Sequence, residues 1–202
     1  MDYAFHVRAL IEAGHAFYAR GWVPATSGNF SARVDDQRVA ITVSGCHKGK
    51  LTPHDIMLVD MAGRSLSEGR SPSAETALHL SLYLRDPAIQ AVLHTHSPPA
   101  TTLSLLLEDA LSLRDYEVLK AFPGIDTHES EVVVPIFAND QDINRLATAI
   151  EHYLDYHLDS YGYLIAGHGF YTWGSSVEDA CRHIEAFEFL FECEMLKRSM
   201  TR

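Results

Sequence analysis

Short apolar segments of strand length alternate along this chain with longer segments of helical period, and this alternation limits the possible folds most strongly. Residues 30–34 and 39–43 alternate in polarity around Asp35-Asp36-Gln37, which predicts a β-hairpin. Strands interleaved with helices are typical of the α/β class, in which helices cover a sheet. We therefore expect an α/β fold with helices on both sides of the sheet.

The expected elements extend along most of the sequence. Helical patterns cover residues 3–20, 73–84, 98–107, 142–154 and 175–197. Further strands are expected at residues 56–60, 89–94, 131–134 and 161–166. The last helix should begin at Ser175, with Glu178 completing a capping box. Apolar side chains surround much of this helix from Phe187 to Phe191, which suggests an oligomer.

The composition is that of an ordinary globular protein. The 202 residues suit one domain, over residues 1–202, and 47% of them are hydrophobic, which is enough to bury a core. The formal net charge of −11 argues against nucleic acid or an anionic membrane as the main partner. A phosphate group can still bind, because backbone N–H groups and one lysine suffice locally.

The sequence contains no signal for secretion or for a membrane. No apolar run approaches the ~18 residues of a membrane-spanning helix. The N-terminal residues 1–15 lack the basic start and apolar stretch of a secretion signal. Three cysteines, Cys46, Cys181 and Cys193, do not make a disulfide framework. We therefore expect a protein of the cytoplasm.

His94-Thr95-His96 closes one of the apolar strands. Alternate residues of a strand point to the same face, so two imidazoles separated by one residue can reach one metal ion. Binding residues in α/β folds also gather at strand ends. Such a pair by itself is more often two histidines without a ligand role.

A third histidine makes a metal site the better interpretation. Ala166-Gly167-His168-Gly169 ends another apolar strand, and its glycines allow the backbone to turn the imidazole inward. Three histidines leave a fourth position open, which is the pattern of a catalytic zinc site. We interpret the other histidines, including His79, as surface or core residues.

Three loops have the chemistry of a phosphate site. Residues 26–29, 44–49 and 71–73 each place hydroxyl groups, backbone N–H groups or a lysine at the end of an element, where an anion is favoured. Any one of them could be a simple turn. Two carboxylates are further candidates for chemistry, although Glu75 could serve only as a helix cap and Glu117 could be a solvated helix residue.

Together these segments resemble the class II aldolase/adducin family along almost the whole chain. The sequences TSGNFS, SGCHKG, PSAETALH, HTH and GHGFYTWG follow in the family's order and spacing. The resemblance implies a mostly antiparallel sheet flanked by helices, and a homotetramer with active sites at subunit boundaries. It also implies one zinc ion per subunit and a small phosphorylated sugar as substrate.

The resemblance also assigns roles to particular residues. Zinc would be bound by His94, His96 and His168. The phosphate pocket would be lined by Gly28, Asn29, Ser44, Gly45, Lys48 and Ser73. Glu75 matches the family's catalytic acidic position, where some relatives have cysteine, and Glu117 matches an acid/base glutamate of the dehydratases.

Softer motifs favour the dehydratases over the aldolases of this family. They are DYEVLKAF, VVVPIFANDQDI and HGFYTWG. The similarity implies dehydration of 5-methylthioribulose 1-phosphate in methionine salvage, with Glu75 as base and Glu117 as acid. A sugar-phosphate aldolase or epimerase is the close alternative, because the same metal site serves both reactions. A non-catalytic adducin-like scaffold is a further alternative.

Overall fold

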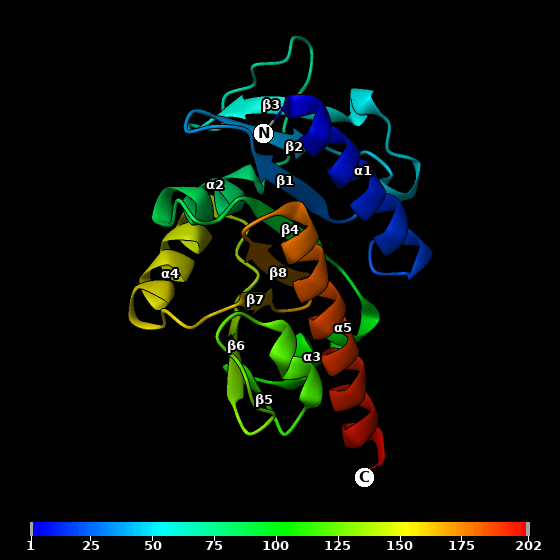
Figure 1. Ribbon diagram of the computed structural model, residues 1–202, viewed down its shortest axis with the longest axis vertical. Coiled ribbons are helices and arrows are strands. Elements are labelled where there is room, and N and C mark those ends of the chain that lie inside the picture. Colours follow the sequence, from blue (N-terminus) through cyan, green and yellow to red (C-terminus); the bar gives the residue numbers. More distant parts are fainter. Residues whose placement is uncertain (1, 201–202) are drawn as a thin grey trace.

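The sheet at the centre of the molecule has the strand order β3-β2-β1-β4-β8-β7-β6-β5 (Figure 1). The computed structural model describes residues 2–200. In that range the strands are β1 Asn29–Arg33, β2 Arg38–Thr42, β3 Ile56–Asp60, β4 Ala91–Thr95, β5 Ala110–Arg114, β6 Glu131–Phe137, β7 Gly162–Ile165 and β8 Gly169–Gly174. Only β6 and β7 pair in parallel among these eight strands, which confirms the mostly antiparallel sheet expected from the family.

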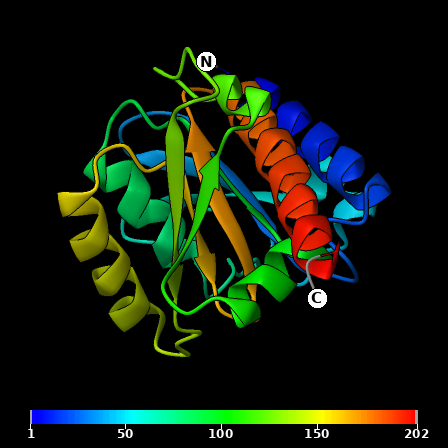
Figure 2. The same ribbon diagram turned by 90° about the horizontal axis from the view of Figure 1, so that it is seen from below.

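Helices cover both faces of this sheet, as predicted. The α-helices are α1 Tyr3–Ala19, α2 Thr76–Arg85, α3 Pro98–Leu106, α4 Ile143–Tyr156 and α5 Val177–Met200, and short 3₁₀ turns are η1 Lys48–Lys50, η2 Pro53–Asp55 and η3 Glu117–Ala121. Figure 2 shows α2 and α4 on one side of the sheet and α1, α3 and α5 on the other. Each side has its own buried apolar cluster, so the fold has three layers.

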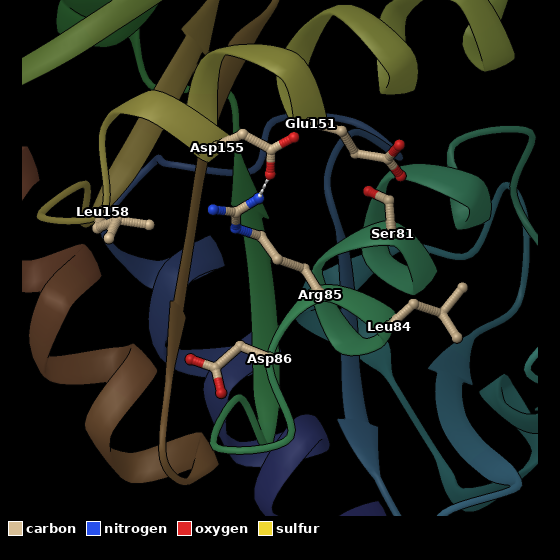
Figure 3. A pocket seen from close by; sticks show the side chains of 7 residues that line it. All are labelled: Ser81, Leu84, Arg85, Asp86, Glu151, Asp155 and Leu158. Carbon is tan, nitrogen blue, oxygen red and sulfur yellow. Dashed lines mark hydrogen bonds and ion pairs between the residues drawn. The ribbon is translucent and has the colours of Figure 1, made fainter.

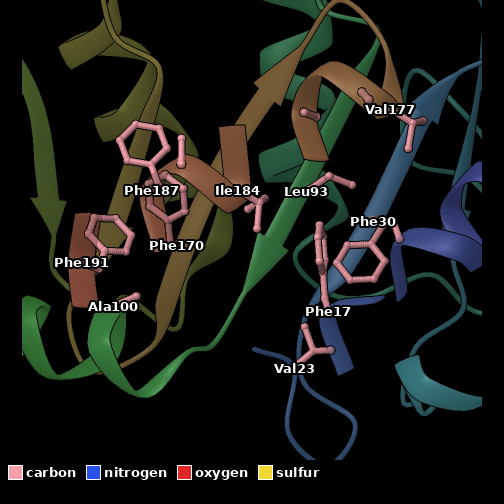
Figure 4. Packing of buried hydrophobic residues seen from close by; sticks show 14 of the residues in the cluster. Phe17, Val23, Phe30, Leu93, Ala100, Phe170, Val177, Ile184, Phe187 and Phe191 are labelled. Carbon is pink, nitrogen blue, oxygen red and sulfur yellow. The ribbon is translucent and has the colours of Figure 1, made fainter. Parts of the chain in front are cut away.

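The larger of the two clusters holds α5 against the sheet. Phe187 and Phe191 on α5 pack against Phe170 of β8, with ring centroids 4.6 and 5.0 Å apart (Figure 4). All three side chains are fully buried within one chain. Phe189, on the other side of the helix, is 50% exposed. From Phe187 to Phe191, the exposed apolar surface that suggested an oligomer is therefore limited to Phe189.

Two strands were not expected from the sequence. β8 begins with Gly169 and ends with Gly174, and glycine lowers strand propensity. Pairing with β4 on one side and β7 on the other stabilises it nonetheless. β5 is an edge strand that pairs with β6 alone. Tertiary pairing decides both strands.

Two helix starts differ from the predictions. The N-terminal cap of α5 is one residue later than expected: Asp179 N donates to Ser176 Oγ at 3.0 Å, and the Asp179 carboxylate accepts from the N–H of Ser175. The expected pair of Ser175 and Glu178 is therefore wrong. α2 begins at Thr76, so Glu75 is its N-cap residue, yet its side chain makes no capping hydrogen bond.

The search for membrane spans gave a negative result. Among residues 2–200, no helix combines the length and the apolar character that crossing a bilayer requires.

Candidate metal centre and active site

Three histidine side chains converge at the end of β4. His94 is the fourth residue of that strand, His96 follows it, and His168 lies in the short connection between β7 and β8. One ring nitrogen from each lies within 4.8 Å of the other two. The Nε2 atoms of His94 and His168 are 3.4 Å apart. Two nitrogens bound tetrahedrally at 2.0–2.1 Å from zinc would be roughly 3.3 Å apart, so this spacing suits a metal site.

Hydrogen bonds orient the ring of His94 and hold the loop that carries His168. His94 Nδ1 lies 3.0 Å from the carbonyl oxygen of Phe170, so it carries the proton and leaves the Nε2 lone pair free. The loop of His168 is attached to α3, because Gly167 N donates to Ser104 Oγ at 3.0 Å. Gly167 has a φ of +63°, which favours glycine at this turn.

The electrostatic environment keeps the imidazoles of His94 and His96 neutral. Burial, together with the neighbouring His168, lowers the pKa of His96 to about 4. Burial and the neighbouring His96 also hold the pKa of His94 well below its usual range. Neutral imidazoles offer the lone pairs that a metal ion needs. The donor set therefore fits a divalent cation that binds nitrogen.

Glu75 lies directly beside this cluster. Its Oε1 is 2.9 Å from His168 Nε2, and its Oε2 accepts hydrogen bonds from Asn29 Nδ2 at 2.6 Å and from the Tyr171 hydroxyl at 2.8 Å. Burial acts to raise the pKa of Glu75, but His168, His94 and Asn29 outweigh it and hold the pKa well below its usual range. The carboxylate is ionised at neutral pH, which is the state that a proton acceptor needs.

A hollow of about 170 Å³ opens next to Glu75 and His96. Its lining includes every residue expected at a phosphate: Gly28, Asn29, Ser44, Gly45, Lys48 and Ser73. Gly28 has a φ of +77°, and a Cβ there would lie 2.6 Å from the His94 carbonyl oxygen, so only glycine fits. The three loops that are distant in sequence thus meet around one hollow beside the histidines.

Lys48 connects two of these loops. Its Nζ donates to the carbonyl oxygens of Thr26 at 3.0 Å and of Cys46 at 2.8 Å. The side chain is buried, and this burial lowers the pKa of Lys48. An ammonium group has three donors, so one N–H remains for an anion.

A second hollow, of about 390 Å³, lies on another side of Glu75 and His96. Leu78, Ile143 and Leu146 contribute apolar side chains to it, and Asn139–Gln141 contribute polar ones. The two hollows share Glu75 and His96 in their lining, so both lie beside the histidine cluster.

Glu117 is not brought to this cluster within one chain. It begins η3, lines neither of the two hollows, and has a side chain that is 71% exposed. Lys120 Nζ lies 2.6 Å from its Oε1, and this hydrogen bond lowers the pKa of Glu117. A role of Glu117 as an acid remains a prediction that needs another subunit.

Sequence reasoning missed two residues near the site. The ring of Tyr171 stacks on His94 with centroids 3.9 Å apart. His79, interpreted as a surface or core residue, is buried and contacts Asn29. The signal for His79 was its position four residues after Glu75, which places both on one helix face. Tyr171 could not be found because β8 was not expected.

Another hollow lies away from the histidine cluster. It measures about 670 Å³ and lies between the ends of α2 and α4 (Figure 3). Its main polar contact is the ion pair of Arg85 with Asp155. It shares no residue with the histidine cluster, so the smaller hollows are the better candidates for a catalytic site.

The fold and this site together define the class of protein. Residues 8–195 match the family model described as the class II aldolase and adducin N-terminal domain. The chain belongs to this family. It is 61% identical to the methylthioribulose-1-phosphate dehydratase of Methylococcus capsulatus, covering 100% of this chain and 99% of the relative. The dehydratase of the same name from Pseudomonas aeruginosa is 57% identical, covering 96% of this chain and 95% of the relative.

A solved structure supports the fold assignment. The l-fuculose-1-phosphate aldolase of Thermus thermophilus superposes with a TM-score of 0.78 at 26% identity, covering 98% of this chain and 97% of that one. The same scaffold therefore occurs in an aldolase, and fold alone does not separate the two activities.

Proposed function

We infer that this chain is a lyase, a methylthioribulose-1-phosphate dehydratase that removes water from 5-methylthioribulose 1-phosphate. The observation that carries this conclusion is the identity of 57–61% to dehydratases of that name over nearly the full length. The product is the 2,3-diketo-5-methylthiopentyl 1-phosphate, formed by loss of the C3 proton and the C4 hydroxyl group. We further propose that the enzyme acts in methionine salvage in the cytoplasm.

His94, His96 and His168 would hold one zinc ion per subunit. When bound, zinc supplies a Lewis acid that polarises the substrate carbonyl group. Glu75 lies beside these ligands as an ionised carboxylate, and we assign it the removal of the C3 proton. The loops around Gly28, Ser44 and Ser73 would position the phosphate and not take part in proton transfer.

We propose that Glu117 acts in the site of a neighbouring subunit of a homotetramer. It would donate the proton to the leaving C4 hydroxyl. An acid needs a raised pKa at neutral pH, and burial is the usual cause. The isolated chain leaves Glu117 exposed and its pKa lowered by Lys120. Burial at a subunit boundary would supply the missing desolvation.

The activity is tested by incubating the purified chain with methylthioribulose phosphate and, separately, with fuculose and ribulose phosphates. Mass spectrometry distinguishes loss of water from cleavage of a carbon–carbon bond. We expect loss of water from the first substrate alone. Cleavage of fuculose or ribulose phosphate would instead identify an aldolase, and a purified chain without metal and without turnover would identify a scaffold.

The position of Glu117 is tested by mixing two inactive variants, His94→Ala and Glu117→Gln. Tetramers of both variants contain sites that combine an intact His94 with a neighbour's intact Glu117. We expect co-expression to restore about a quarter of the wild-type activity, if subunits mix at random in a cyclic assembly. No recovery in verified mixed tetramers would place both residues in one chain.

A further inference from the structure

A buried chain of hydrogen bonds leads from β1 to Glu75. His79 lies on α2, one turn after Glu75, and is fully buried. Its Nε2 contacts Asn29 Oδ1, and its Nδ1 lies 2.7 Å from Ser31 Oγ. Ser31 Oγ in turn lies 2.8 Å from the hydroxyl of Tyr83. None of these contacts is needed to bind a metal or a phosphate.

The direction of each bond follows from the orientation of the Asn29 amide. Its Nδ2 donates to Glu75 Oε2 at 2.6 Å. The Asn29 oxygen therefore faces His79, which must donate from Nε2. Nδ1 of His79 is then an acceptor, and the Ser31 hydroxyl donates a hydrogen bond to it.

The protonation state of His79 agrees with these directions. Burial lowers the pKa of His79 to about 4, although the charge of Glu75 acts to raise it. The ring is neutral at neutral pH and has one donor and one acceptor, which is what the chain requires. Without this ring, the Asn29 oxygen would lose its donor, and of these two contacts only the one with Glu75 would orient the amide.

We propose that His79 is a positioning residue that locks the Asn29 amide and thereby fixes the orientation of the Glu75 carboxylate. A flipped amide would present its oxygen to Glu75 and repel it. Glu75 is only 17% exposed, so few water molecules could replace the lost donor. The role of His79 in turnover rests on the proposed function, because it acts through Glu75.

Two substitutions at His79 separate positioning from packing. His79→Leu fills the space without a donor, and we expect kcat to fall roughly 10- to 100-fold, with KM and bound metal little changed. His79→Gln can place an N–H near the former Nε2, and we expect it to recover most of kcat. A Leu variant with wild-type kcat, or a Gln variant as inactive as the Leu variant, would overturn the proposal.

The path through Asn29 is tested by a double-mutant cycle. If His79 acts only through Asn29, the double variant Asn29→Ala/His79→Leu should have the kcat of Asn29→Ala alone. Independent, multiplying losses would contradict this path. His183→Leu is a matched control, because His183 is a buried histidine on α5 with Nδ1 at a backbone oxygen of Trp173. It should lower the melting temperature and leave kcat unchanged.

A spectroscopic measurement on the wild-type protein tests the geometry of this hydrogen-bond chain. It requires neither turnover nor a variant that folds. Nitrogen-15 NMR of histidine-labelled wild-type protein reports which ring nitrogen carries the proton. We expect a neutral Nε2–H tautomer for His79 at neutral pH. A proton on Nδ1, or a charged ring, would reject the inference. If the tautomer is as expected but no substrate is dehydrated, the proposed function fails and the hydrogen-bond chain stands.

Discussion

At the scale of single residues, the histidine cluster and its surroundings contain polar side chains that are shielded from water. His94 is fully buried, and His168 approaches it from a different part of the chain. A buried acid on α5, Glu188, accepts a hydrogen bond from Thr95 Oγ1 at 2.8 Å. It therefore contacts the segment that carries His94 and His96 from the opposite face of the sheet.

Removal of one histidine tests the metal site. His168→Ala should lower both bound zinc and turnover, because two remaining imidazoles hold the ion much more weakly. Metal analysis of the purified variant, by mass spectrometry, measures this. His128→Ala is the control, since His128 is exposed and lies outside the cluster. Full zinc occupancy in His168→Ala would exclude it as a ligand.

Glu188 should make stability depend on pH. Burial raises the pKa of Glu188 to about 7, although hydrogen bonds from Ser97 and Thr95 act to lower it. The folded state thus binds a proton that the unfolded state releases above its ordinary pKa of about 4.3. The free energy of unfolding should fall as pH rises from there to about 7, and the loss should persist above it.

The variant Glu188→Gln cannot ionise and should escape this loss. We expect its melting temperature to exceed that of the wild type at pH 8 by more than it does at pH 5. Glu192→Gln, on the exposed side of the same helix, should show no such difference. Equal effects of Glu188→Gln at both pH values would show that folding does not raise the pKa of Glu188.

At the scale of elements, the ends of helices and strands place the functional groups. α2 begins one residue after Glu75, and its N-cap side chain is turned to the histidines instead of capping the helix. β4 carries His94, and the tight connection between β7 and β8 carries His168. The antiparallel pairing of β4 with β8 therefore brings these two histidines close together.

The start of α5 provides a test of how such an end is fixed. Ser176→Ala removes the acceptor for Asp179 N, and we expect the free energy of unfolding to fall by about 1 kcal/mol. Denaturant titration measures this loss. Glu178→Gln is the matched control, because Glu178 is exposed and is not part of the observed cap. A larger loss from Glu178→Gln would restore the capping box first expected.

At the scale of the whole molecule, the site depends on parts of the chain that only the complete sheet brings together. The loops that are expected to bind phosphate precede α2. His94 and His96 lie at the end of β4, and His168 follows β7. The unfolded chain has no such cluster. A ligand that binds the folded state alone stabilises it in proportion to the logarithm of its concentration.

Metal removal should therefore lower the stability of the whole fold. We expect chelator-treated protein to melt at a lower temperature, and zinc to restore it. Free zinc at 100 times its dissociation constant would add about 2.7 kcal/mol to the free energy of unfolding. Scanning calorimetry measures the shift. His168→Ala should show no shift with zinc, and an equal shift in this variant would indicate binding elsewhere.

Local sequence patterns were sufficient to predict the α/β class, most of the helices and strands, and most of the residues that gather at the site. Local patterns suffice for these, because hydrophobic period and short motifs such as His94-Thr95-His96 are properties of neighbouring residues. The phosphate loops were also recognisable, since glycine and hydroxyl residues at element ends have a local chemical reason.

Only the tertiary structure decided β5, β8 and the polar contacts of Glu75. β8 is stabilised by its two neighbours and not by its own composition, so no local pattern predicts it. Tyr171 of β8 donates directly to Glu75, and His79 contacts Asn29, which in turn contacts Glu75. Contacts of this kind depend on which segments become adjacent in the fold. The exposure of Glu117 likewise follows only from the folded chain. Its separation from His96 along the sequence does not show whether its side chain points toward the site or toward solvent.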